Sequence, residues 1–243
     1  MNHTIGDHRT RFLQLALRVG ALRFGDFTLK SGRQSPYFFN AGRFDSGAAL
    51  TELAGCYADA IDAHDVGSVP GTGKAASFDL LFGPAYKGIP LATALACEYA
   101  GRGRDLPVAF NRKEAKAHGE GGSLIGADLA GRRVLIVDDV ITAGTAIREA
   151  LDIISAAGGS VAAIVIALDR QEVAGGPDNP AAAPRRSAAE TVACDHGVPV
   201  IAVASLDDLL AFAGGQAELA DQRERLRAYR DAYGTAADTG MRR

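Results

Sequence analysis

The sequence predicts an α/β fold in which helices cover both faces of a mostly parallel central sheet. Short apolar runs rich in β-branched residues, such as 134–137, alternate with longer segments whose apolar residues recur at helical spacing. Continuous apolar runs of this kind are typical of strands buried on both faces. The 243 residues contain no internal repeat and no clear second domain. We therefore expect a single domain over 1–243.

The first 45 residues predict a helix followed by a β-hairpin. Residues 9–19 have the broad apolar face of an amphipathic helix, and Gly20 is expected to end that helix. Phe27 and Leu29 alternate with polar residues, as in a half-buried strand. Residues 31–32 are expected to turn the chain into a second strand at 37–40.

After the hairpin, strands and helices alternate. Strands are expected at 78–82, 108–110, 134–137, 161–168 and 198–204, and helices at 46–63, 89–100, 146–157, 188–196, 205–213 and 216–233. Two stretches rich in small residues, at 65–77 and 173–187, are expected to be loop insertions, and 234–243 a flexible tail. Within the first insertion, 67–74 resembles a nucleotide P-loop. Its glycines are one residue too far apart and Ala75 replaces the required Ser or Thr, so a surface loop is the better interpretation.

The most informative segment is 134–146, which reads VLIVDDVITAGTA. A buried strand leads into Asp138 and Asp139, then into a loop of small and hydroxyl residues that opens a helix. The first N–H groups of a helix lack partners within it and bind phosphate readily. The carboxylates would repel a phosphate, so they suit sugar hydroxyls or a nearby metal. The segment predicts a site for a phosphorylated sugar; the alternative is that the acids only cap the helix.

Two further segments lie where parallel sheets bind ligands, at the carboxyl ends of predicted strands. Residues 85–88 follow the strand at 78–82, and Arg170 follows the strand at 161–168. In addition, 111–122 concentrates cations and ends in glycines. This pattern is typical of a lid that closes over an anion, although a solvated turn is the simpler alternative.

Composition excludes several other classes. With a net charge of −3 the chain has no overall positive field for nucleic acid, and no apolar run reaches the length of a membrane helix. The three cysteines lack the spacing of a zinc site or a disulfide framework. The polar N-terminus lacks the apolar core of a signal peptide. We expect a cytoplasmic protein without nucleic-acid or membrane partners.

Several segments together resemble the orotate phosphoribosyltransferase family of type I phosphoribosyltransferases, in its bacterial form. They are FTLKSGRQSPYFFNAG, LLFGPAYKGIP, FNRKEAKAHGEGG, VLIVDDVITAGTA and LDRQE, within about 9–233. The resemblance implies the type I phosphoribosyltransferase fold, with 1–45 forming a small hood over the site. It also implies an enzyme of UMP biosynthesis that transfers the 5-phosphoribosyl group from phosphoribosyl pyrophosphate (PRPP) to orotate. The products would be orotidine 5′-monophosphate and pyrophosphate.

The resemblance carries over to individual residues. PRPP would be bound by Lys30, Tyr86, Lys87, Arg112, Lys113, Lys116, His118, Asp138, Asp139, Val140, Ile141, Thr142, Ala143, Gly144, Thr145 and Ala146. Orotate would be bound by Phe38 and Phe39, largely through backbone, and by Thr142 and Arg170. In this family the peptide at Ala85-Tyr86 is often a non-proline cis bond.

The same resemblance implies a mechanism in which the bond to pyrophosphate breaks ahead of bond formation to orotate. The groups implied in catalysis are Arg112, Lys113, Lys116, His118, Asp138 and Asp139. Mg²⁺, held mainly through PRPP without a direct protein ligand, would help to stabilise the leaving group. His118 could act as a general acid or only as a hydrogen-bond donor, and we favour the donor. In relatives the lid reaches into the neighbouring subunit, which implies a homodimer with shared active sites.

The sequence disfavours three other functions. A phosphoribosyltransferase for another base, such as uracil or a purine, is disfavoured by the phenylalanine pair and Arg170. A non-enzymatic regulator that senses PRPP would need a nucleic-acid surface, and no basic helix is visible. A bifunctional chain would need a second domain of sufficient length.

Overall fold

The computed structural model describes residues 7–29, 32–64, 78–113, 124–173 and 186–235. The predicted insertion at 65–77, most of that at 173–187, and nearly all of the predicted tail lie outside the described residues. The site candidates Lys30, Lys116 and His118 also lie outside them.

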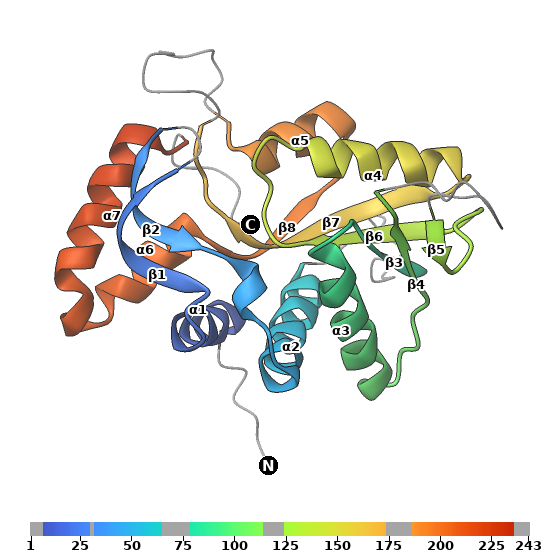
Figure 1. The fold of residues 1–243 in the computed structure, drawn as a ribbon, viewed down its shortest axis with the longest axis horizontal. Helices are drawn as coiled ribbons and strands as arrows, with labels where there is room; N and C mark the ends of the chain where they lie inside the picture. The colour runs from blue at the N-terminus through green and yellow to red at the C-terminus, as the bar shows by residue number, and fades with distance from the viewer. Residues whose placement is uncertain (1–6, 30–31, 65–77, 114–123, 174–185, 236–243) are drawn as a thin grey trace, which may run out of the picture.

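The described chain alternates between strands and helices, as predicted (Figure 1). The helices are α1 (His8–Arg18), α2 (Gly47–Ala63), α3 (Gly88–Gly101), α4 (Thr145–Ala156), α5 (Ala188–His196), α6 (Leu206–Gly214) and α7 (Ala220–Tyr233), with 3-10 turns η1 (Ala41–Arg43) and η2 (Ala217–Leu219). The strands are β1 (Leu22–Thr28), β2 (Gln34–Phe39), β3 (Leu80–Gly83), β4 (Val108–Asn111), β5 (Leu124–Gly126), β6 (Arg133–Asp138), β7 (Ser160–Asp169) and β8 (Val200–Ser205).

The central sheet has the strand order β5-β4-β3-β6-β7-β8. All its neighbouring strands run parallel except β4 and β5. From β3 the chain proceeds outward to β4 and β5, whereas from β6 it proceeds in the other direction to β7 and β8. The boundary between β3 and β6 is therefore a topological switch point, and a crevice for ligands forms at the carboxyl ends of strands at such points.

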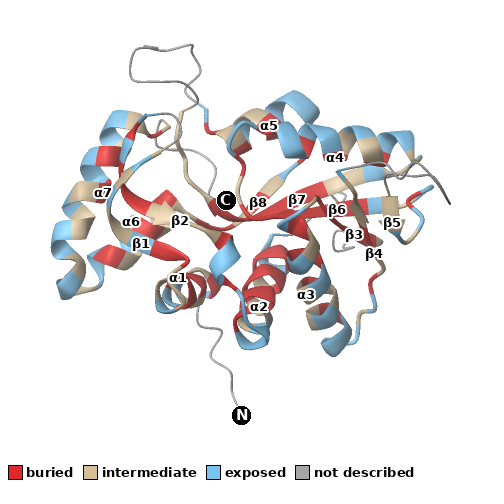
Figure 2. Ribbon diagram, viewed as in Figure 1, coloured by how far each residue is buried: buried red, intermediate tan, exposed pale blue. Residues whose placement is uncertain are grey.

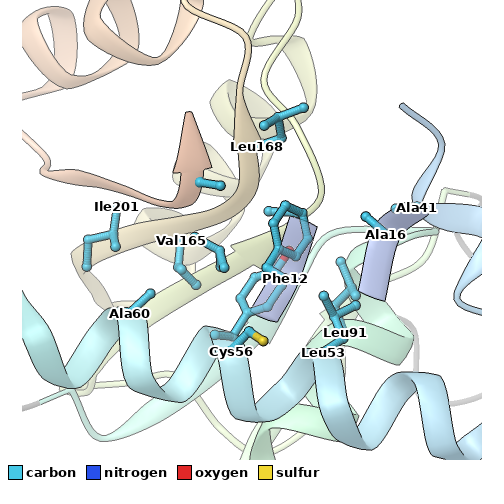
Figure 3. Close-up of a cluster of buried hydrophobic side chains, with 14 of the residues drawn as sticks. Phe12, Ala16, Ala41, Leu53, Cys56, Ala60, Leu91, Val165, Leu168 and Ile201 are labelled. Carbon is cyan, nitrogen blue, oxygen red and sulfur yellow. The ribbon is translucent and has the colours of Figure 1, made fainter. Parts of the chain in front are cut away.

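Two apolar cores cover the two faces of this sheet, as the buried residues in Figure 2 indicate. Successive residues of a strand point to opposite faces. Leu81, Leu135 and Val165 accordingly join the core beneath α1, α2 and α3, whereas Ile136 and Ile164 join the core beneath α4 and α5. Figure 3 shows part of the first core, where α1, α2 and the sheet meet. This burial on both faces explains why the strands read as continuous apolar runs.

The hairpin of β1 and β2 forms a separate antiparallel sheet beside the central one (Figure 1). Helix α7 packs against β2, and the rings of Tyr37 and Tyr229 meet edge to face with centroids 6.1 Å apart. The hood predicted from the N-terminal residues thus also rests on the C-terminal helix. None of the described helices combines the length and the apolar character that crossing a bilayer requires.

The structure corrects two details of the prediction and confirms a third. β5 was not predicted, because a strand of three residues at a sheet edge is too short to show periodicity. The helix predicted at 216–233 is divided into η2 and α7. Leu219 ends η2 and directly precedes α7, which has no side-chain cap. The peptide bond Ala85-Tyr86 is cis, as the resemblance implied.

Candidate active site

The loops that follow β3 and β6 meet at the switch point of the sheet. Lys87, after β3, places its Nζ atom 2.6 Å from Oδ2 of Asp139, after β6. The carboxylate is buried, whereas half of the lysine side chain is exposed. This ion pair brings together two residues that the sequence assigned to PRPP, from segments 52 positions apart.

The loop after β6 leads directly into α4. Gly144 is the residue before the helix and has a φ of 71°, the left-handed conformation that glycine adopts without strain. Thr142, Ala143, Thr145 and Ala146 are exposed around it. No side chain caps α4, so its first N–H groups have no side-chain acceptor, an arrangement that suits the anion site predicted from the sequence.

Asp138 and Asp139 are both buried but occupy different environments. Burial, followed by the neighbouring charge of Asp139, raises the pKa of Asp138 to about 7. Oδ1 of Asp138 accepts a hydrogen bond from the backbone N–H of Asp139 at 2.9 Å. Tyr57 of α2 donates its hydroxyl to the carbonyl oxygen of Asp138 at 2.8 Å. The acidic pair is therefore fixed from both the sheet and a helix beneath it.

The connection between β3 and α3 is unusually tight. A Cβ atom on Gly83 would lie 2.3 Å from the carbonyl oxygen of Gly88, and one on Gly88 would lie 2.7 Å from that of Val137. Only glycine fits at either position. The loop is also held by Asn111 at the end of β4, whose Oδ1 accepts a hydrogen bond from the N–H of Ala85 at 2.8 Å.

Tyr86 extends from this loop into solvent and is 67% exposed. Nζ of Lys113 lies over its ring, 5.2 Å from the centroid. This contact brings the start of the predicted lid to the β3 loop of the same chain. Arg112, the preceding residue, is partly exposed.

Arg170 follows β7 on the same edge of the sheet, and its guanidinium lies against the hairpin. Its Nε donates to the hydroxyl of Tyr37 at 3.4 Å, and its Nη2 is 2.7 Å from Oε1 of Glu172. The two predicted orotate residues of β2 point apart. Phe38 packs with Phe27, whereas Phe39 packs towards the core against Phe12 and Phe44. A contact from these residues to orotate would therefore come from the β2 backbone.

Comparison with known proteins agrees with this geometry. The model of the family described as phosphoribosyl transferase domain matches residues 71–183. An orotate phosphoribosyltransferase of Xanthomonas campestris is 72% identical over 229 residues, covering 94% of this chain and 97% of its own. That of Stenotrophomonas maltophilia is 67% identical over 230 residues, covering 95% and 98%.

The chain belongs to the orotate phosphoribosyltransferase family. Among solved structures, the orotate phosphoribosyltransferase of Francisella tularensis superposes with a TM-score of 0.77 at 38% identity, covering 92% of this chain and 99% of its own. The type I phosphoribosyltransferase fold expected from the sequence is thereby confirmed.

Three residues that support the orotate phosphoribosyltransferase site were missed or left without a role by the sequence. Arg148 donates from Nη2 to the carbonyl of Ala143 at 2.8 Å. It so braces, from α4, the loop at 138–146, which we call the phosphate loop after its predicted ligand. Tyr57 was expected only as part of the helix at 46–63, and Asn111 only as part of the lid. The sequence signals for these two roles are weak. A buried tyrosine such as Tyr57 usually finds a partner for its hydroxyl, and Asn111 lies at the carboxyl end of a parallel strand, where ligand sites form.

The carboxylates at the site suit a metal ion that enters already bound to the phosphates of the substrate. Within the described ranges no group of three or more His, Cys, Asp or Glu side chains could hold a metal ion. The two carboxylates beside the loop are Asp138, which is buried, and Asp139, which is paired with Lys87. Mg²⁺ commonly binds through one or two carboxylates together with substrate phosphates and water, and this donor set fits that arrangement.

Proposed function

We propose that the carboxyl edge of β3, β6 and β7 is where this chain transfers the 5-phosphoribosyl group of PRPP to orotate. The ring nitrogen of orotate displaces pyrophosphate at the anomeric carbon and yields orotidine 5′-monophosphate. The observation that carries this proposal is the ion pair of Lys87 and Asp139, which joins the β3 and β6 loops beside the uncapped start of α4. The 72% identity to an orotate phosphoribosyltransferase supports the choice of reaction.

The phosphate of PRPP binds the loop that precedes α4. The backbone N–H groups of Thr142 to Ala146 and the hydroxyls of the two threonines supply the donors. The carboxylates of Asp138 and Asp139 take the ribose hydroxyls, since these groups can donate to a buried acceptor. The negative charge of the pair also stabilises the positive charge that develops on the ribose as pyrophosphate departs.

The departing pyrophosphate is stabilised by cations from the β3 loop and the lid. Lys87 and Lys113 approach from the same chain, because Lys113 lies over Tyr86 next to Lys87. Arg112, together with Lys116 and His118 outside the described residues, supplies the remaining donors. Mg²⁺ bound to the pyrophosphate would neutralise part of its charge, with most ligands from PRPP oxygens and water.

Orotate lies between the hood and the end of β7. Arg170 takes its carboxylate in a charge-assisted hydrogen bond, Thr142 reaches it from the phosphate loop, and the backbone of β2 closes over the ring. This placement turns the ring nitrogen towards the anomeric carbon. The gain in rate comes from orientation before the chemical step.

The enzyme works as a cytoplasmic homodimer in which Arg112, Lys116 and His118 of the lid complete the site of the neighbouring subunit. Support for the dimer comes from the family resemblance, and support for the location comes from three free thiols, two of them exposed. Mixing Lys87→Ala protein with Arg112→Ala protein tests the shared site. Each variant alone should be nearly inactive, and the mixture should regain activity as hybrid dimers form; a mixture that stays inactive would argue for sites built from one chain.

The activity is tested by following orotate absorbance with PRPP and Mg²⁺, with uracil or hypoxanthine in place of orotate as controls. Orotate should be consumed and neither control base converted; turnover of uracil or hypoxanthine at a similar rate would support a transferase of another specificity. Lys113→Ala should lower kcat by about 100-fold or more because a leaving-group donor is lost. Arg133→Ala, which removes a cation at the opposite edge of the sheet, is the matched control.

A further inference from the structure

A buried polar cluster lies directly behind Arg170, and we call its members Arg33, Tyr37, Arg170, Glu172 and Tyr229 the Glu172 cluster. Oε1 of Glu172 is 2.7 Å from Nη2 of Arg170, and its Oε2 is 3.7 Å from Nη1 of Arg33. The side chain of Glu172 is 14% exposed and that of Arg33 is 7% exposed. One carboxylate is thus shared by two guanidinium groups away from solvent.

The cluster carries an unbalanced positive charge. Of the described residues, Glu172 is the only acidic side chain within ion-pairing distance of either arginine. Burial raises the pKa of Tyr37 well above its ordinary value, so its hydroxyl stays protonated and donates to Glu172 at 3.3 Å. Since a buried charge without a partner is costly, such a cluster favours the arrival of one further anion.

The hydrogen-bonding capacity of the two arginines is also incompletely used. The described contacts give Arg170 a single hydrogen bond, from Nε to Tyr37. Its Nη2 atom is close to Glu172 but outside hydrogen-bonding geometry, and Nε of Arg33 is buried without an acceptor. Arg170 is therefore held in place by charge and by stacking on the ring of Tyr37, 5.3 Å from its centroid.

Glu172 also joins three parts of the fold. It forms an isolated antiparallel bridge with Gly234, just after α7. Arg33, after the hairpin turn, donates to the carbonyl of Val173 at 2.8 Å and stacks over the ring of Tyr233 at 5.0 Å. The side chain that faces Arg170 is thus anchored by the end of β7, the hood and the C-terminal helix.

We propose that Glu172 is a positioning residue for orotate, which acts through Arg170. The carboxylate of Glu172 holds the guanidinium of Arg170 in place by charge, against the ring of Tyr37. Arg33 balances part of the charge of Glu172, so Arg170 still attracts a second carboxylate. This inference rests on the proposed contact between Arg170 and the carboxylate of orotate.

The test is a double-mutant cycle on orotate kinetics with Glu172→Gln, Arg170→Gln and the double variant. Glu172→Gln keeps the shape of the side chain and removes its charge. It should raise the orotate KM about tenfold and leave the PRPP KM within about twofold. In the Arg170→Gln background the same change should add less than about twofold, since residues that act through one another are not additive. Independent, multiplying effects would overturn the proposal.

A matched control removes a neighbouring anchor of α7 without touching Arg170. Arg230 pairs with Asp207 at 2.9 Å, so Arg230→Gln loosens the same helix and should leave the orotate KM unchanged. A rise equal to that of Glu172→Gln would mean that general loosening, and not Arg170, is responsible. If Glu172→Gln does not fold, Glu172→Asp replaces it in the test. The shorter side chain keeps the charge but moves it away from Arg170, so it should still raise the orotate KM selectively.

The two assignments fail in different ways. If Arg170→Gln raises the orotate KM and Glu172→Gln does not, the positioning role is wrong and the orotate contact stands. If Arg170→Gln leaves the orotate KM unchanged, the orotate contact is wrong, and the positioning role fails with it.

Discussion

In the proposed site, the phosphate loop and the Glu172 cluster would recognise an anion in opposite ways. The loop at 138–146 uses consecutive residues, and its donors are backbone N–H groups at the uncapped start of α4. The Glu172 cluster uses side chains from Arg33 to Tyr229, which only the folded chain brings together. The loop attracts an anion through the partial positive charge at the start of α4. The cluster attracts one through the net positive charge of two arginines that share one carboxylate.

This difference predicts which substitutions each region tolerates. Backbone donors do not depend on side-chain identity, so the loop is sensitive to changes that move the backbone. The cluster depends on shared charge, so single side-chain changes alter it while the backbone stays in place. Variants in the two regions should therefore affect different substrates.

The largest effect is expected from Gly144→Ala in the loop. A Cβ at this position would lie 3.1 Å from Nη1 of Arg148 and 3.2 Å from Val192, on a backbone with φ of 71°. We expect the strained backbone to relax and Arg148, which braces the loop, to be displaced. The PRPP KM should therefore rise by about 100-fold, with a loss of about 1–2 kcal/mol in stability from the left-handed conformation. Steady-state kinetics and thermal unfolding measure the two effects.

Gly197→Ala provides the control for backbone strain. Gly197 has a similar φ of 65°, but nothing lies within 4 Å of an added Cβ, and it precedes β8 at the opposite edge of the sheet. It should lose similar stability with unchanged kinetics. A PRPP KM near the normal value in Gly144→Ala would remove the backbone argument for the loop.

The next effect concerns Asp138, whose pKa is raised to about 7 by burial and by Asp139. The folded state retains a proton that the unfolded state loses as pH rises from about 4 to 7, so ionisation of Asp138 lowers the free energy of unfolding over that window. Asp138→Asn should therefore stabilise the protein at pH 8, by on the order of 2 kcal/mol, and the gain should vanish near pH 4.

The same variant should lose activity, because the amide lacks the charge that stabilises the ribosyl cation. Urea unfolding at pH 4, 6 and 8 together with kcat at pH 8 tests both parts. A variant that is less stable than the wild type at pH 8 would contradict the assigned pKa. Unchanged kcat would contradict the role at the ribose.

The smallest and most diagnostic effect compares two buried tyrosines. The hydroxyl of Tyr57 donates to the carbonyl of Asp138 at 2.8 Å, whereas that of Tyr37 contacts Arg170 and Glu172 at 3.4 and 3.3 Å. Each loss to phenylalanine should cost about 1 kcal/mol of unfolding free energy. Tyr57→Phe should raise the PRPP KM about threefold and Tyr37→Phe the orotate KM about threefold. The same substrate affected by both variants would show that the regions are not separate.

Much of the fold was predictable from the sequence because its signals are local. The strands are buried on both faces, so each reads as an apolar run, and the phosphate loop occupies consecutive positions. The two errors of the prediction also have local causes. β5 is too short to show a period. The apolar spacing of 216–233 did not reveal that the helix is interrupted after Leu219.

The sequence by itself determined the alternation of strands and helices, the position of the loop predicted to bind an anion, and the family to which the chain belongs. Only the tertiary structure decided that Lys87 pairs with Asp139, that Lys113 lies over Tyr86 of its own chain, and that Arg33 shares Glu172 with Arg170. The physical reason is the range of each interaction. Helix starts and strand burial arise from neighbours along the chain. A shared buried charge arises only when hairpin, sheet and terminal helix exclude water from the same place.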